Sequence, residues 1–115
     1  MKERAYLIGV VLPGTPPAAV EEQMRELQEL LLTAGAEVVA SDVQRRDAVE
    51  PGLFVGKGKV EEIRDRREEL RYDLVVCNDD LSPRQQRNLE RELKIKVVDR
   101  TGLILDIFAQ HARTR

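Results

Sequence analysis

Glycine and lysine alternate in the middle of the chain, at Gly56, Lys57, Gly58 and Lys59. Glycine lets a backbone approach a bound group closely, and lysines at the start of a helix add positive charge, so this segment suits a phosphate. It is not a P-loop, because its spacing from Gly52 is wrong and no Ser or Thr follows the lysine. It is not a dinucleotide fingerprint either, since the third glycine is missing. By its motif alone, a tight turn into a helix is favoured over a nucleotide site.

A row of cations is the second candidate, and it consists of Arg84, Arg87, Arg91 and Lys94. The spacing of three, four and three residues places all four on one face of a predicted helix. Such a row could contact the phosphate backbone of a nucleic acid. Two glutamates lie on the same helix, and taken alone the row is better explained as a solvated surface.

Three carboxylates, Asp79, Asp80 and Asp99, follow two apolar segments that are predicted to be strands. Because the carboxyl ends of parallel strands form the ligand crevice, Asp79 and Asp80 could ligate Mg²⁺ or act as acid and base. Alternatively, Asp80 belongs to the turn before the next helix, and Asp99 forms an ion pair with Arg100 at a strand–helix corner.

No catalytic constellation emerges from the sequence. A histidine-based triad or a zinc site would depend on His111 alone, because it is the single histidine. The single cysteine, Cys77, lies in an apolar segment and is interpreted as a small core residue; a reducing compartment is therefore expected.

Composition excludes several classes of protein. A net charge of −2 argues against a domain that is basic over its whole surface, and 3% aromatic residues argue against a base-stacking platform. No segment resembles a signal peptide or a membrane span, so we expect a cytoplasmic protein with no membrane partner.

The elements that must position these residues alternate along the chain. Apolar segments predict strands near residues 5–12, 37–43, 74–78 and 95–99, with helical patterns between them, including one from Lys59 to Leu70 and one from Ser82 to Leu93. Strands alternating with helices predict one three-layer α/β domain over residues 1–115, with a four-stranded parallel sheet flanked by helices.

The last segment predicts an apolar C-terminal helix. No Gly or Pro ends it before the chain stops, so we expect a truncated helix. Its apolar residues are expected to be partly uncovered or buried by another copy of the chain, which would give self-association through this helix. These residues are Leu103, Ile104, Ile107 and Phe108.

Four stretches, in this order, resemble the N-terminal domain of the HflX family of ribosome-associated GTPases. They are QRRD at residues 44–47, FVGKGKVEEI at 54–63, DDLSPRQQRNLE at 79–90 and VVDRTGLILDIFAQHARTR at 97–115. The last stretch contains the family-signature corner of Asp99, Arg100, Thr101 and Gly102. In that family a helical hairpin and a Ras-like GTPase domain follow, and neither they nor the guanine-specificity motifs occur in this sequence.

The resemblance implies binding to the large ribosomal subunit and its rRNA, and a part in splitting or rescuing stalled ribosomes. GTP and Mg²⁺ would belong to the parent's GTPase domain, which would itself be a partner, and this chain would carry no cofactor and no catalytic residue. For some members, ATP binding or RNA remodelling has been ascribed to the N-terminal region. The leading hypothesis is therefore a non-enzymatic ribosome-binding module. The alternative is an ATP-binding domain with weak ATPase activity that uses Lys57, Lys59 and a carboxylate such as Asp80 or Asp99.

Overall fold

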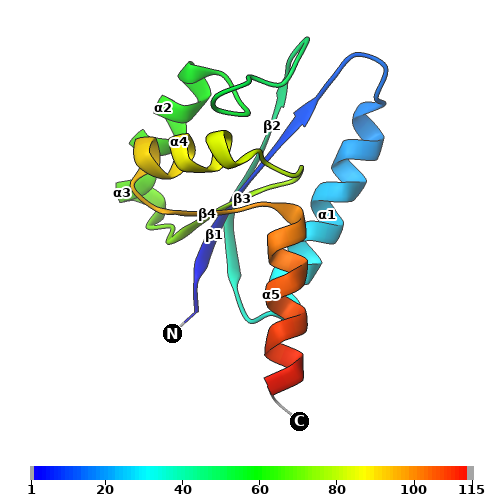
Figure 1. Ribbon diagram of the computed structural model, residues 1–115, viewed down its shortest axis with the longest axis vertical. Coiled ribbons are helices and arrows are strands. Elements are labelled where there is room, and N and C mark those ends of the chain that lie inside the picture. Colours follow the sequence, from blue (N-terminus) through cyan, green and yellow to red (C-terminus); the bar gives the residue numbers. More distant parts are fainter. Residues whose placement is uncertain (1, 114–115) are drawn as a thin grey trace.

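Strands and helices alternate through the computed structural model, which describes the backbone of residues 2–113 and the side chains of residues 2–109. The elements are β1 (Arg4–Val11), α1 (Pro17–Thr33), β2 (Glu37–Arg45), α2 (Lys57–Asp65), α3 (Arg67–Leu70), β3 (Leu74–Cys77), α4 (Pro83–Leu93), β4 (Lys96–Val98) and α5 (Arg100–Arg113). The four strands form one parallel sheet in the order β2-β1-β3-β4, with helices on both faces (Figure 1). This confirms the predicted fold class.

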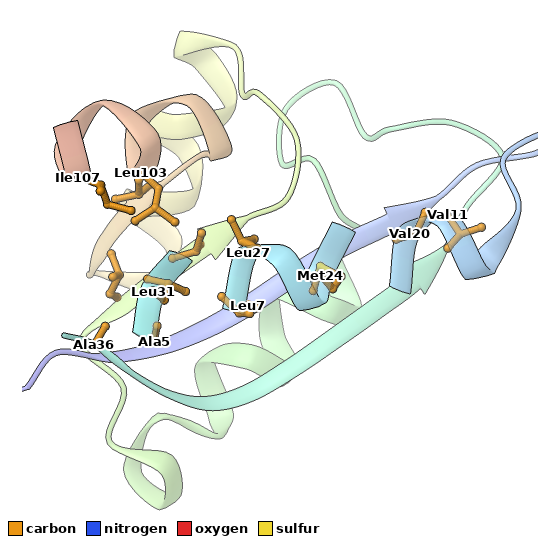
Figure 2. Packing of buried hydrophobic residues seen from close by; sticks show 13 residues of the cluster. Ala5, Leu7, Val11, Val20, Met24, Leu27, Leu31, Ala36, Leu103 and Ile107 are labelled. Atoms are coloured by element: carbon orange, nitrogen blue, oxygen red, sulfur yellow. The ribbon is translucent and has the colours of Figure 1, made fainter. Parts of the chain in front are cut away.

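The sheet separates two apolar cores. On one face, α1 and α5 pack against β1 and β3, and Figure 2 shows how Leu27 and Leu31 of α1 lie beside Leu103 and Ile107 of α5. On the other face, α2 and α4 contribute Val60, Ile63, Leu89 and Leu93 to the second core. Because helices cover both faces, β1 is buried from Ala5 to Val11 and β3 along its whole length.

The predicted helix from Lys59 to Leu70 is wrong in its boundaries. The structure has two helices there, because Arg66 takes a conformation that closes α2 before α3 begins at Arg67. The α2 helix also begins two residues earlier than predicted, at Lys57. Lys57, Gly58 and Lys59 therefore form the first turn of a helix and not a loop before it.

The expectation for the apolar residues of α5 is half right. Leu103 is 6% exposed and Ile107 is 9% exposed, since both pack into the core beneath α1, so the prediction that they are uncovered or covered by a second copy is wrong. Ile104 is half-buried, and Phe108 is 69% exposed, as expected. No helix within the described residues is long and apolar enough to cross a membrane.

Candidate nucleic-acid interface

Helix α4 is fixed at both ends and along its inner face. Its N-cap, Ser82, accepts a hydrogen bond from the Gln85 backbone N–H at 3.1 Å, and the Gln85 side chain accepts one from the Ser82 N–H at 2.9 Å, which completes a capping box. Leu89 and Leu93 are buried against the sheet. Lys94 ends the helix in a left-handed conformation, with φ of 53°. These contacts hold α4 in place, and they fix which of its residues face outward.

The predicted cation row lies on that outer face. Arg84, Arg87 and Arg91 are exposed, and Lys94 is exposed one residue beyond the last turn. Considering the described residues only, none of these four cations forms an ion pair with a carboxylate. Arg91 donates a hydrogen bond to Asn88 Oδ1 at 2.6 Å. The row is thus free to bind an external anion.

Gly56 makes a contact within the fold through its backbone. It is the N-cap of α2 with φ of −64°, which any residue can adopt, and its N–H donates to Gln44 Oε1 at 3.0 Å. A Cβ at Gly56 would lie 2.6 Å from Arg46 Nη1, which is the far end of a flexible side chain that can move aside. Its backbone donor is therefore already used within the fold.

The two lysines of this segment face different surroundings. Lys57 is exposed. Lys59 lies beneath the helix with a side chain only 15% exposed, its Nζ 3.0 Å from Glu62 and 3.7 Å from Asp42. Asp42 also accepts a hydrogen bond from the Tyr6 hydroxyl, and burial together with Asp42 raises the pKa of Tyr6. Lys59 is therefore paired with carboxylates of the fold, and of the two lysines Lys57 alone is available to a ligand.

A groove between α2 and α4 brings the two predicted sites together. It has a volume of about 290 Å³, and its lining residues are Leu53, Lys57, Val60, Glu61, Asn88, Arg91 and Glu92. The Arg64 guanidinium reaches Glu92 at 3.7 Å. Two carboxylates weaken the positive potential of this groove, so it suits contact with an extended anionic backbone better than enclosure of one phosphate.

The signature corner holds the fold together. Asp99 precedes α5, and its carboxylate accepts hydrogen bonds from the Gly102 N–H at 2.8 Å and from the Leu81 N–H at 3.0 Å. A Cβ at Gly102 would lie 3.0 Å from Asp99 Oδ1, so glycine permits this close approach. Thr101 donates its hydroxyl to Asp80 Oδ1 at 2.6 Å, which ties α5 to the loop after β3.

The predicted ion pair between Asp99 and Arg100 is wrong, because Arg100 points to α1. Its guanidinium lies 3.2 Å from Glu26 and donates to Asn78 Oδ1 at 2.8 Å. Asn78, which is 3% exposed, donates in turn to Gln23 at 2.9 Å. Arg100 thus satisfies a buried amide at the end of β3.

The remaining candidate residues do not come together as a catalytic or metal site within the described residues. Burial and the neighbouring Asp80 raise the pKa of Asp79. In the part of the chain that the structure describes, no three His, Cys, Asp or Glu side chains come together as metal ligands, and Asp79 and Asp80 stay only a prediction for Mg²⁺. The His111 side chain lies outside the described residues. Cys77 is fully buried, as predicted, and burial raises the pKa of its thiol.

A cleft that was not predicted from the sequence lies at the carboxyl ends of β1 and β2. It has a volume of about 830 Å³ and lies between the loop after β1, with Pro13 and Gly14, and the end of β2, with Arg45 and the following Arg46. The prolines after β1 and the two consecutive arginines at the end of β2 were the available signals. The sequence predicts the crevice instead at the ends of β3 and β4, where Asp80 accepts a hydrogen bond from the Thr101 hydroxyl and Asp99 accepts from two backbone N–H groups.

Comparison with known proteins identifies the family of this chain. The family model described as GTP-binding GTPase N-terminal matches residues 21–109. GTPase HflX of Lacrimispora saccharolytica is 48% identical over 115 residues, which is 100% of this chain and 27% of that protein. GTPase HflX of Escherichia coli K12 is 45% identical over 93 residues, which is 81% of this chain and 22% of that protein. The chain therefore spans about a quarter of the length of these curated relatives.

Solved structures show the same fold. A crystal structure of the G235S variant of SsGBP matches with a TM-score of 0.75 and 24% identity, over 95% of this chain and 33% of that one. A GTP-binding protein from Sulfolobus solfataricus, solved in complex with GDP, matches with a TM-score of 0.69 and 24% identity, over 93% of this chain and 30% of that one.

Proposed function

This chain belongs to the GTP-binding GTPase N-terminal family as an HflX-type N-terminal domain, and we propose that it is a non-enzymatic module that binds the rRNA of the large ribosomal subunit. The surface that binds is the outer face of α4, with Lys57 of α2 beside it. In the intact parent, a GTPase domain with GTP and Mg²⁺ would do the chemistry. The complete protein would act in the cytoplasm, in the splitting or rescue of stalled ribosomes.

The observation that supports this proposal most directly is that the α4 arginines are exposed and have no carboxylate partners among the described residues. Arg84, Arg87 and Arg91 are exposed in a row, and none has a carboxylate partner among the described residues. Three unpaired guanidiniums in a row on a rigid helix suit bidentate contact with successive phosphates, because the planar guanidinium offers two parallel donors. Few aromatics are available for stacking, so these contacts would be with the backbone and shape of the RNA.

The second candidate is ATP binding at the first turn of α2, and it has less support. Gly56 has its N–H bonded to Gln44, and Lys59 is paired with Glu62 and Asp42. Of the residues from Gly56 to Lys59, only Lys57 and Gly58 are exposed to a ligand, and no atom lies within 4 Å of a Cβ placed at Gly58. Isothermal titration of this chain with ATP and GTP, with and without Mg²⁺, measures this candidate directly; saturable binding that Lys57→Ala abolishes would favour it.

The test of the leading proposal is co-sedimentation of the full-length parent with large ribosomal subunits at several salt concentrations. Each neutralised phosphate contributes about −0.7 to −0.9 to the slope of log affinity against log salt. We expect Arg87→Ala with Arg91→Ala to weaken binding and to make that slope less steep by about 1.4 to 1.8. The melting temperature should be nearly unchanged, because both side chains are exposed.

The control is Lys2→Ala with Arg25→Ala, which removes the same charge from exposed positions outside α4. It should leave affinity and slope as in the wild type apart from a small long-range effect. If the two double variants lose affinity and salt slope equally, the α4 row is only a solvated surface and not the binding site. Binding would then have to come from other parts of the parent.

A further inference from the structure

The two edge strands of the sheet differ in whether other groups of the domain bond to their outward backbone groups. On the outer side of β4, the Gln86 side chain donates to the Val97 carbonyl at 2.8 Å, and the Val97 N–H donates to the Glu90 carboxylate at 3.3 Å. Two side chains of α4 thus occupy the backbone groups that β4 would offer to a further strand. This edge is closed to strand addition.

The outer edge of β2 has no such cover. The Arg46 N–H donates to the Val11 carbonyl at 3.0 Å, at the end of the parallel ladder between β2 and β1. Because backbone groups alternate in direction along a strand, those of Ser41, Val43 and Arg45 point away from β1. Among residues 2–109 no group bonds to them, and all three residues are exposed.

The β2 strand is also long and carries an exposed apolar residue at the middle of this free segment. It spans nine residues, from Glu37 to Arg45, and Val43 is 41% exposed. An edge of this kind is a template for pairing with another strand, through backbone hydrogen bonds and a few side-chain contacts.

We propose that the free edge of β2 pairs, in antiparallel direction, with the same edge of a second copy of this chain, and that the two-fold axis passes between the two Val43 residues. In this register Val43 faces Val43 of the other copy, and Ser41 faces Arg45. All three residues with outward backbone groups are then in hydrogen-bonded pairs, and the two sheets join into one.

The sequence of β2 favours a second copy in this register over the neighbouring ones. Centring the pair on Val43 places Asp42 opposite Gln44, which can donate to it. A shift that centres the pair on Asp42 places two carboxylates opposite each other. It also brings Val39 into the new ladder, where β2 is irregular because it has one residue more than β1 between Val38 and Ala40. A shift to Gln44 leaves Ser41 without a partner in the strand. The Val43 register alone uses the whole free edge without a repulsive pair.

This interface is small, so the dimer is weak and depends on concentration. Disulfide trapping is therefore the first test. Residues that face each other in a hydrogen-bonded antiparallel pair have Cα atoms about 5.5 Å apart, which lies within the range that a disulfide can bridge. The native Cys77 is buried and does not compete.

We expect Val43→Cys to form a covalent dimer under mild oxidation. Ser41→Cys alone should not, because Ser41 does not face itself, but a mixture of Ser41→Cys with Arg45→Cys should give the heterodimer. Cross-linking of Ser41→Cys as readily as Val43→Cys would mean random collision and would overturn the proposed register.

Sedimentation equilibrium provides the second test. Val43→Pro removes an N–H that points outward, so it spares the ladder to β1 and should weaken the dimer by at least about tenfold. Val43→Thr keeps the branched shape and the N–H, and it should associate like the wild type. A wild-type chain that is monomeric at all concentrations and gives no disulfide as Val43→Cys would overturn the proposal. Circular dichroism checks that the proline variant is folded, and the cysteine variants decide the question if it is not.

Discussion

Asp99 shows what the polar residues at the carboxyl edge of the sheet do. Its two carboxylate oxygens accept one backbone hydrogen bond from the first turn of α5 and one from the loop before α4. Arg100 and Asp80 likewise bond within the fold, to Asn78 and to Thr101. The corner that most resembles the family is thus explained by the requirements of folding, with no need for a ligand.

Replacing Asp99 tests this reading. We expect Asp99→Ala to lower the free energy of unfolding by about 2 kcal/mol, because it removes the N-cap of α5 and leaves the Leu81 N–H without a partner. Urea denaturation measures the change. Asp47→Ala is the matched control, since Asp47 is exposed and makes no ion pair with another described residue, and its effect should stay within about 0.5 kcal/mol. Equal effects of the two substitutions would refute a structural role for Asp99.

The first turn of α2 decides how its glycines should be interpreted. A Cβ at Gly56 would meet the tip of the Arg46 side chain at 2.6 Å, whereas a Cβ at Gly58 would meet nothing within 4 Å. Gly58 also has no positive φ, in contrast to Gly35, which follows α1 with φ of +88°. A substitution at Gly56 therefore requires the Arg46 side chain to move, and a substitution at Gly58 requires no movement.

Alanine substitutions at these glycines should have opposite signs. Gly58→Ala should raise the free energy of unfolding by about 0.5 kcal/mol, because alanine restricts the unfolded chain and favours the helix. Gly35→Ala should lower it by about 1 kcal/mol, because alanine is strained in the left-handed region. Thermal unfolding of both variants measures the difference, and a destabilised Gly58→Ala would mean that the first turn of α2 is not the ordinary helix described above.

For the whole molecule, α5 completes the core beneath α1. Leu103 and Ile107 are buried against α1 and the sheet (Figure 2), while Leu105 is 61% exposed on the opposite side of the same helix. The domain as described therefore covers the inner face of α5 with its own residues. Only the outer face is left uncovered within the described residues.

Truncation of two leucines on α5 should separate these faces. We expect Leu103→Ala to lower the free energy of unfolding by about 2–3 kcal/mol, through lost burial and a cavity beside α1. Leu105→Ala should change it by less than about 0.5 kcal/mol. Chemical denaturation measures both, and similar losses would show that α5 is covered on its outer face as well.

The four strands and their alternation with helices could be predicted from local sequence patterns, whereas the division of one predicted helix into α2 and α3 could not. The apolar runs of β1 and β3 predicted strands buried on both faces, and Ser82 before Pro83 predicted the start of α4, because both signals are local. Alternation of strands with helices then predicted parallel pairing. The environments of Lys57 and Lys59, two residues apart in the sequence, could not be predicted in this way, because each depends on the residues that pack against that lysine.

The tertiary structure alone decided those environments. Arg66 and Arg67 are good helix formers, so nothing local marked the break between α2 and α3, where Arg66 instead donates to the Tyr6 hydroxyl at 3.0 Å. Likewise, Asp42 lies 17 residues before Lys59, and it removes that lysine from solvent. Periodicity shows which face of a helix is apolar, but a salt bridge or a covered face arises only when distant elements pack together.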